Sequence, residues 1–188
     1  MVTRELEGPF TKSKVAGLRC GQLVRLSGRT VVAHNGACKL IEDHADAVDL
    51  TDAAVFYCGP LMRKQDGAWT AVSAGPTVSG RLDAFSTVFF QRGAGVIIGG
   101  GAVGEAVRAA CAASGGVYLQ AVAGAAATIG SALGQARDVM FLKEPVTADA
   151  IWGFEAQGLE AVVAIDSRGR SLHRRVRAGS RRRLESMR

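Results

Sequence analysis

Short apolar segments separated by glycine-containing turns recur along the chain. In the first third, β-rich segments at residues 22–26 and 29–33 flank Ser27-Gly28, which predicts a hairpin. Residues 53–58 are uninterruptedly apolar, and Gly59-Pro60 follows them, so we predict a buried strand that ends there.

Strands and amphipathic helices alternate over the rest of the chain. We predict strands at residues 68–73, 95–98, 117–122, 138–142 and 160–165, and helices at about 36–48, from 79 or 80 to 93, at 103–113 and at 125–133. Asn35 is the expected N-cap of the first of these helices. The alternation favours an α/β fold, and the neighbouring strands of the first third add a second β layer.

Length and composition are those of one domain with its own core. The chain has 188 residues, shows no internal repeat, and has no obvious linker before its C-terminal tail. The longest apolar or small segment, residues 121–129, is mostly Ala and Gly and is too short to span a membrane. The first residues lack the apolar segment of a signal peptide. We therefore expect a cytoplasmic protein without a membrane partner.

The four cysteines are widely separated, and none forms a C-x-x-C pair, as the positions Cys20, Cys38, Cys58 and Cys111 show. A zinc ribbon or a self-contained iron–sulfur site needs closer spacing. We interpret the cysteines as reduced core thiols and expect no metal ligand in this chain.

The positive charge is concentrated at the C-terminus. The net charge is +6, but the nine arginines and single acid from Arg168 onward carry +8, so the remainder carries −2. Such a tail can contact nucleic acid or an acidic partner, or it can be a solvated, disordered end. No aromatic residue is interleaved for base stacking, so we favour the solvated end and do not expect nucleic acid binding.

A glycine cluster at residues 99–104 fits the G-x-G-x-x-G spacing of dinucleotide-binding loops. In such proteins an acid at the end of the next strand binds the ribose, whereas here that strand ends in Gln120, Ala121 and Val122. Two interpretations remain: a tight strand-to-helix turn, or the same turn with its free N–H groups directed at an anion.

A second loop, residues 74–83 ("AGPTVSGRLD"), has the groups that a small dicarboxylate needs. Pro76 stiffens the turn, and Thr77 and Ser79 offer hydroxyls. The planar fork of Arg81 matches a carboxylate, and we expect Asp83 to support the start of the following helix. An ordinary surface turn with an exposed arginine explains these residues equally well.

This loop resembles the G-P-T-T-x-x-R-M-D segment of the class I fumarase and L(+)-tartrate dehydratase β-type domain, an iron–sulfur hydro-lyase family. The likeness covers about residues 15–170. Other segments resemble that family in the same order: "GQLVRLSGRTVVAHNGACKLI", "VFYCGP", "VIIGGG", "GGVYLQAVAGAAATI" and "ADAIWGFEAQGLEAVVAIDSRG".

The resemblance implies an α/β fold of the swivelling β/β/α type, a single domain with mixed sheets. Residues 15–170 would form the β-type hydro-lyase domain, between an N-terminal extension (1–14) and a basic tail (171–188) that can be disordered. It also implies that a [4Fe–4S] cluster is held by a partner α-type subunit, where one iron acts as a Lewis acid, and that this chain binds none. The chain would be the β subunit of a two-subunit enzyme that adds or removes water at malate, fumarate, tartrate or a related acid, as a homodimer or an α2β2 assembly.

The resemblance also assigns roles to residues of the two loops. Thr77 matches a threonine linked to proton abstraction, and because an unassisted hydroxyl is a poor base, it would need a carboxylate from the partner. Arg81 matches the arginine that binds a substrate carboxylate. The remaining expected substrate-binding residues are Ser79, His34, Asn35 and Gly100.

Four positions of these segments depart from the family pattern. A lysine of the family falls on Gly100, an Arg-Asp pair falls on His34 and Asn35, and a second threonine falls on Val78. A protonated His34 can replace part of the missing charge. The departures leave an alternative open: a non-catalytic or re-specialised relative that binds a carboxylate ligand.

Overall fold

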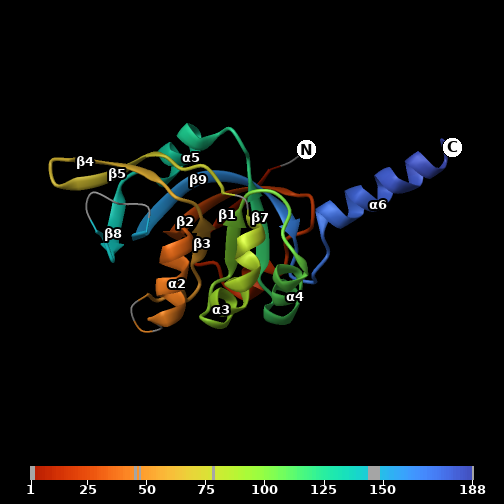
Figure 1. Cartoon of the computed structure of the whole chain (residues 1–188), viewed down its shortest axis with the longest axis horizontal. Coiled ribbons are helices and arrows are strands. Elements are labelled where there is room, and N and C mark those ends of the chain that lie inside the picture. Colours follow the sequence, from red (N-terminus) through yellow and green to blue (C-terminus); the bar gives the residue numbers. More distant parts are fainter. Residues whose placement is uncertain (1–2, 45, 47, 78, 144–148, 188) are drawn as a thin grey trace.

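A computed structural model describes residues 3–44, 46, 48–77, 79–143 and 149–187 of the chain. It has a mixed α/β fold in one domain (Figure 1). The strands are β1 (Arg4–Glu7), β2 (Leu23–Ala33), β3 (Ala54–Tyr57), β4 (Leu61–Gln65), β5 (Ala68–Ser73), β6 (Val96–Gly99), β7 (Val117–Ala121), β8 (Ala136–Met140) and β9 (Ile151–Ile165). The helices are α1 (Lys12–Val15), α2 (Asn35–Asp43), the 3₁₀ helix η1 (Ser79–Ala84), α3 (Ser86–Gln91), α4 (Glu105–Ser114), α5 (Ala126–Leu133) and α6 (Leu172–Glu185).

Five strands close on themselves into a ring. β2, β3, β6 and β7 are parallel neighbours in that order, and β9 runs antiparallel to both β7 and β2. β1 pairs with β2 outside the ring, β8 pairs with β9, and β4 and β5 form a separate hairpin. The carboxyl ends of four parallel strands therefore meet at one edge of the ring.

The expected hairpin at Ser27-Gly28 is wrong. Both predicted segments belong to the single strand β2, and the pairing with β9 shifts register between Leu26 and Gly28. Gly28 has a φ of 139°, and a Cβ there would lie 3.0 Å from the backbone of Gly8. The glycine thus permits a bulge and a close backbone contact instead of a chain reversal.

Alternate residues of the ring strands face two different cores, as period-2 strands require. Phe56, Ile98 and Leu119 pack in the first core, together with Trp152, whose ring meets Trp69 edge-on at 5.4 Å. The second core contains the residues on the opposite face of the same strands and is covered by α2, α3 and α4, whereas α5 and the β4–β5 hairpin lie on the other side (Figure 1). Several boundaries of these elements differ from the sequence predictions.

The helix expected from residue 79 or 80 to 93 is divided into η1 and α3. The predicted last strand, 160–165, is only the second half of β9. The helix that begins at Asn35 has His34 at its N-cap position, without a side-chain cap, so Asn35 is not the cap.

Both terminal segments are structured. β1 lies within residues 1–14, and Phe10 is fully buried. The basic segment after residue 170 forms α6, which has no buried residue and projects away from the ring (Figure 1). No helix in the described part of the chain is both long enough and apolar enough to cross a membrane.

Candidate functional site

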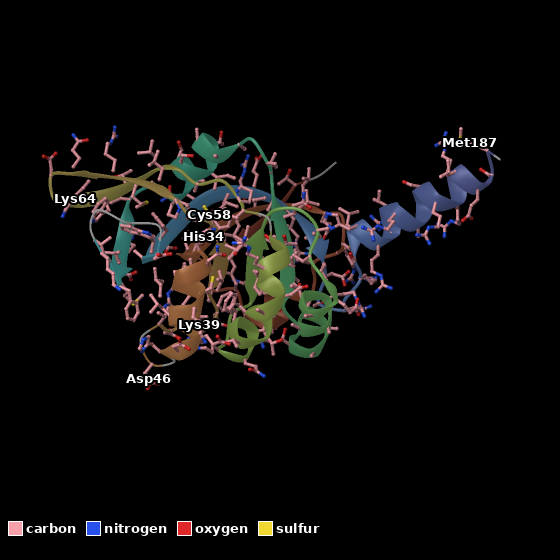
Figure 2. The ribbon with its side chains drawn as sticks, in the orientation of Figure 1. His34, Lys39, Asp46, Cys58, Lys64 and Met187 are labelled. Atoms are coloured by element: carbon pink, nitrogen blue, oxygen red, sulfur yellow. The ribbon has the colours of Figure 1, made fainter. Side chains whose placement is uncertain are left out.

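The sequence-predicted residues meet at the carboxyl edge of the parallel strands, where ligands bind in open α/β sheets. His34 and Asn35 follow β2, and Gly100 follows β6. The loop that carries Thr77 and Ser79 crosses the same edge, since Cys58 and Pro76 form a β-bridge and the Thr77 N–H donates to the Tyr57 carbonyl at 3.5 Å. Figure 2 shows His34 and Cys58 close together at this edge.

Ser79 joins the two loops. Its Oγ is fully buried, accepts the Gly100 N–H at 2.7 Å and donates to the Thr77 carbonyl at 3.1 Å. The Ser79 N–H donates to the Gly100 carbonyl at 3.1 Å. Ser79 therefore positions the site loops.

The glycines of the β6 loop permit this contact. A Cβ on Gly99 would lie 2.1 Å from Ser79 Oγ, and one on Gly100 would lie 2.8 Å from the Thr77 carbonyl oxygen. Gly101 has a φ of 74°, and its carbonyl accepts the Tyr118 hydroxyl at 3.1 Å. A lysine at position 100 would therefore clash with the loop in its present arrangement.

Tyr57 and Asn35 form a second contact at the same edge. The fully buried Tyr57 donates its hydroxyl to Asn35 Oδ1, and its ring centroid lies 5.6 Å from that of His34. Burial raises the pKa of Tyr57, and the charge of Arg81 partly opposes this shift. Tyr57 is therefore protonated at neutral pH and remains a hydrogen-bond donor.

Arg81 is exposed and forms no ion pair with an acid in the described ranges. Thr77, four residues before Arg81, is half-buried. Val78, where the family pattern has its second threonine, lies outside the described residues. Thr77 and Gly100 lie in loops, Ser79 and Arg81 in η1, and His34 and Asn35 at the start of α2. All six belong to segments at one edge. This arrangement can offer a cation, hydroxyls and backbone N–H groups to a small anion.

Asp83, and three residues that the sequence analysis did not single out, contribute to the same edge. Tyr57 and Tyr118 end or line strands that were predicted only as core. Asp83 accepts the N–H of Gly104, the N-cap of α4, at 3.0 Å, so it supports the start of α4 and not of its own helix. Asp149 lies beside the start of α2, because a Cβ on Gly36 would meet its Oδ1 at 2.7 Å. No local sequence signal points to these contacts, because they join segments that are remote in sequence.

The cysteines do not fit as ligands of an iron–sulfur cluster. Such clusters are bound by several cysteine thiolates that lie close together. Within the described ranges, no three His, Cys, Asp or Glu side chains are grouped so that they could hold a metal ion. We therefore assign no catalytic step to a cluster held by the described residues of this chain.

These features define an α/β domain whose polar loops gather at the carboxyl edge of a closed set of strands. The profile of the family described as Fumarase C-terminus matches residues 2–176. The chain therefore belongs to the Fumarase C-terminus family.

Relatives with assigned names carry the same domain. The chain is 31% identical over 181 residues to a putative fumarate hydratase class I of Geobacillus stearothermophilus, a match that covers 95% of this chain and 35% of the relative. It is 30% identical over 174 residues to a putative L(+)-tartrate dehydratase subunit beta of Methanocaldococcus jannaschii, with 89% of each chain covered. It is 27% identical over 172 residues to the L(+)-tartrate dehydratase subunit beta of Escherichia coli K12, covering 89% of this chain and 85% of the relative.

The chain therefore spans about a third of the fumarate hydratase and most of each beta subunit.

Proposed function

We propose that this chain is the β subunit of a two-subunit iron–sulfur hydro-lyase that adds or removes water at a small hydroxy-dicarboxylate such as malate, fumarate or tartrate. Two relatives that match over most of their length are named as beta subunits of tartrate dehydratase, and a third is named a fumarate hydratase. The proposal includes the swivelling β/β/α type for the fold, an α-type partner that holds the [4Fe–4S] cluster, and a cytoplasmic location.

The observation that carries the proposal is Arg81, which forms no ion pair with an acid of the described residues and belongs to η1, whose first residue, Ser79, is hydrogen-bonded to the β6 turn. A guanidinium without a protein carboxylate is available for a substrate carboxylate, which it can bind through two parallel N–H···O bonds. Because the loop is already hydrogen-bonded, little ordering is needed when the substrate binds.

The neighbouring side chains suggest their own roles. Tyr57 remains protonated and donates its hydroxyl to Asn35 Oδ1, so it holds the Asn35 amide in place at this edge. Thr77 offers a hydroxyl four residues before Arg81 in the sequence, and because no described carboxylate pairs with either residue, the base that activates Thr77 is proposed to come from the partner.

The proposal is tested by co-expression with an α-type partner, anaerobic cluster reconstitution, and assays of fumarate hydration and of malate and tartrate dehydration. We expect turnover of at least one of these acids. In Arg81→Ala, kcat/KM should fall by about ten- to a hundredfold for each charged hydrogen bond lost, whereas the matched charge loss Arg182→Ala on α6 should have no effect. An intact cluster without turnover of any of the three acids would refute the proposal.

The alternative, a non-catalytic or re-specialised carboxylate binder, rests on Gly100 and His34. The contacts of Gly100 strengthen the case that a lysine is absent for a structural reason. The names of the relatives do not favour this alternative, since they are a hydratase and dehydratase subunits. Carboxylate binding by the natural chain, together with complete absence of turnover in the reconstituted complex, would support it.

A further inference from the structure

A cavity lined by arginines lies where α6 leaves the body of the protein. Its volume is about 500 Å³, and its lining residues are Arg19, Cys20, Gly169, Arg170, Ser171, Arg174 and Arg175. Four of the seven lining residues are cations and none is an acid. Like charges repel each other, so a bound anion would stabilise these four arginines at one cavity.

One wall of the cavity is rigid because a buried carboxylate organises it. Asp166 is fully buried and accepts the backbone N–H groups of Cys20, Arg168 and Arg170 at 3.1–3.3 Å, and the Arg170 Nε at 2.7 Å. These donors keep the pKa of Asp166 below its usual value, although burial alone would raise it. Asp166 thus fixes the backbone on both sides of the cavity and neutralises only Arg170.

The other three arginines are poorly compensated. Arg174 Nη1 lies 3.3 Å from Glu105 Oε2, but the same carboxylate also pairs with Arg108. Arg175 packs against the Gly21 turn, where a Cβ would lie 2.9 Å from its Nη2, and neither it nor Arg19 pairs with an acid of the described ranges. A surplus of positive charge therefore remains at the cavity.

The cavity is separate from the candidate site. Residues 19–20 precede β2, and residues 169–171 follow β9, whose end pairs with the start of β7. The cavity thus lies toward the amino edge of the parallel strands, whereas His34, Ser79 and Gly100 lie at their carboxyl edge. Its ligand is independent of the proposed hydro-lyase function.

We propose that this cavity binds a small oxyanion with two or more negative charges, either a phosphate compound or a polycarboxylate. Guanidinium forks bind both groups through paired hydrogen bonds. Ser171, the N-cap of α6, lines the same cavity, and its Oγ accepts the Arg174 N–H at 3.4 Å. The volume is sufficient for a compact ligand and lies within the range of small-molecule sites.

The test uses calorimetric titration of the full chain with inorganic phosphate, pyrophosphate and citrate, each at an ionic strength held constant with sodium chloride. We expect saturable binding of at least one of them with a stoichiometry of one. Arg19→Ala and Arg175→Ala should each weaken it about tenfold or more, because each removes hydrogen bonds to a charged ligand. Arg181→Ala removes the same charge from α6 outside the cavity and should change the affinity by less than twofold. Circular dichroism of each variant checks that the fold is retained.

The outcomes separate the explanations. Tighter binding of pyrophosphate than of citrate assigns a phosphate ligand, and the reverse assigns a polycarboxylate. An equal loss of affinity in Arg181→Ala and Arg175→Ala would show that only the general charge of α6 matters, and would overturn the proposal. The absence of saturable binding by any of the three anions would overturn it as well. Arg175→Lys, which retains the charge but loses the fork, should bind more weakly than the natural chain if the contact is bidentate.

Discussion

Replacing Ser79 by alanine removes the hydroxyl that joins the two site loops. The hydroxyl is fully buried and has one hydrogen bond at 2.7 Å to the Gly100 N–H and one at 3.1 Å to the Thr77 carbonyl. Loss of one partner of a buried hydrogen bond costs about 1–3 kcal/mol. For a domain of this size about 2 kcal/mol corresponds to a fall in Tm of about 4–8 °C.

Ser86 provides a matched control a few residues further along the chain. It is as buried as Ser79, but its Oγ has no hydrogen-bond partner within the described part of the chain. Ser86→Ala should therefore leave the stability unchanged or raise it slightly, since a buried unsatisfied hydroxyl is unfavourable. Thermal unfolding followed by circular dichroism, with urea unfolding to check the free energy, measures both variants. Equal losses of stability in the two variants would refute the assigned role of Ser79.

Three further predictions concern the same edge. Gly99→Ala should be strongly destabilising and Gly80→Ala neutral in thermal unfolding, because an added Cβ would lie 2.1 Å from Ser79 Oγ in the first case and meets nothing within 4 Å in the second. Gly100→Lys, which restores the residue of the family pattern, should lower Tm and fail to raise activity of the reconstituted complex, since its Cβ would lie 2.8 Å from the Thr77 carbonyl oxygen; higher activity at unchanged Tm would contradict this. Burial raises the pKa of Tyr118 to about 12, so the folded form keeps a proton that the unfolded chain loses near pH 10, and stability should fall by about 2–3 kcal/mol between pH 10 and 12. Tyr118→Phe should lack this part of the alkaline loss in pH-dependent urea unfolding, although it loses the hydrogen bond to Gly101 at all pH values.

The regular elements of the middle of the chain were predictable because their signals are local. The apolar strands at residues 95–98 and 117–122 and the helix at 103–113 correspond closely to β6, β7 and α4. In contrast, β9 extends over Ile151–Ile165 through charged and glycine-containing positions. It is held by pairing with three strands: β2 along most of its length, β8 near its start and β7 near its end. The continuity of β2 through Gly28 likewise depends on Gly8, twenty residues away in sequence.

The candidate site was predictable in its residues but not in its geometry. The composition of one loop and a family resemblance brought Thr77, Ser79 and Arg81 to attention, and the resemblance alone indicated His34 and Gly100. The contact between Ser79 and Gly100, and the hydroxyl of Tyr57 on Asn35, join segments that are remote in sequence. No local pattern encodes such pairs, so a tyrosine in an apolar strand was interpreted as core alone.

The pairing of β2 with β9 has a consequence for the order of events during synthesis. The two strands span residues 23–33 and 151–165, so the ring cannot close until β9 has left the ribosome. Until then β2 and β7 have edges whose backbone groups are unpaired, and such edges are templates for association between chains. A nascent chain of this protein is thus exposed to aggregation until β9 is available. A chain that stops before residue 151 lacks β9 and cannot cover these edges by closing the ring.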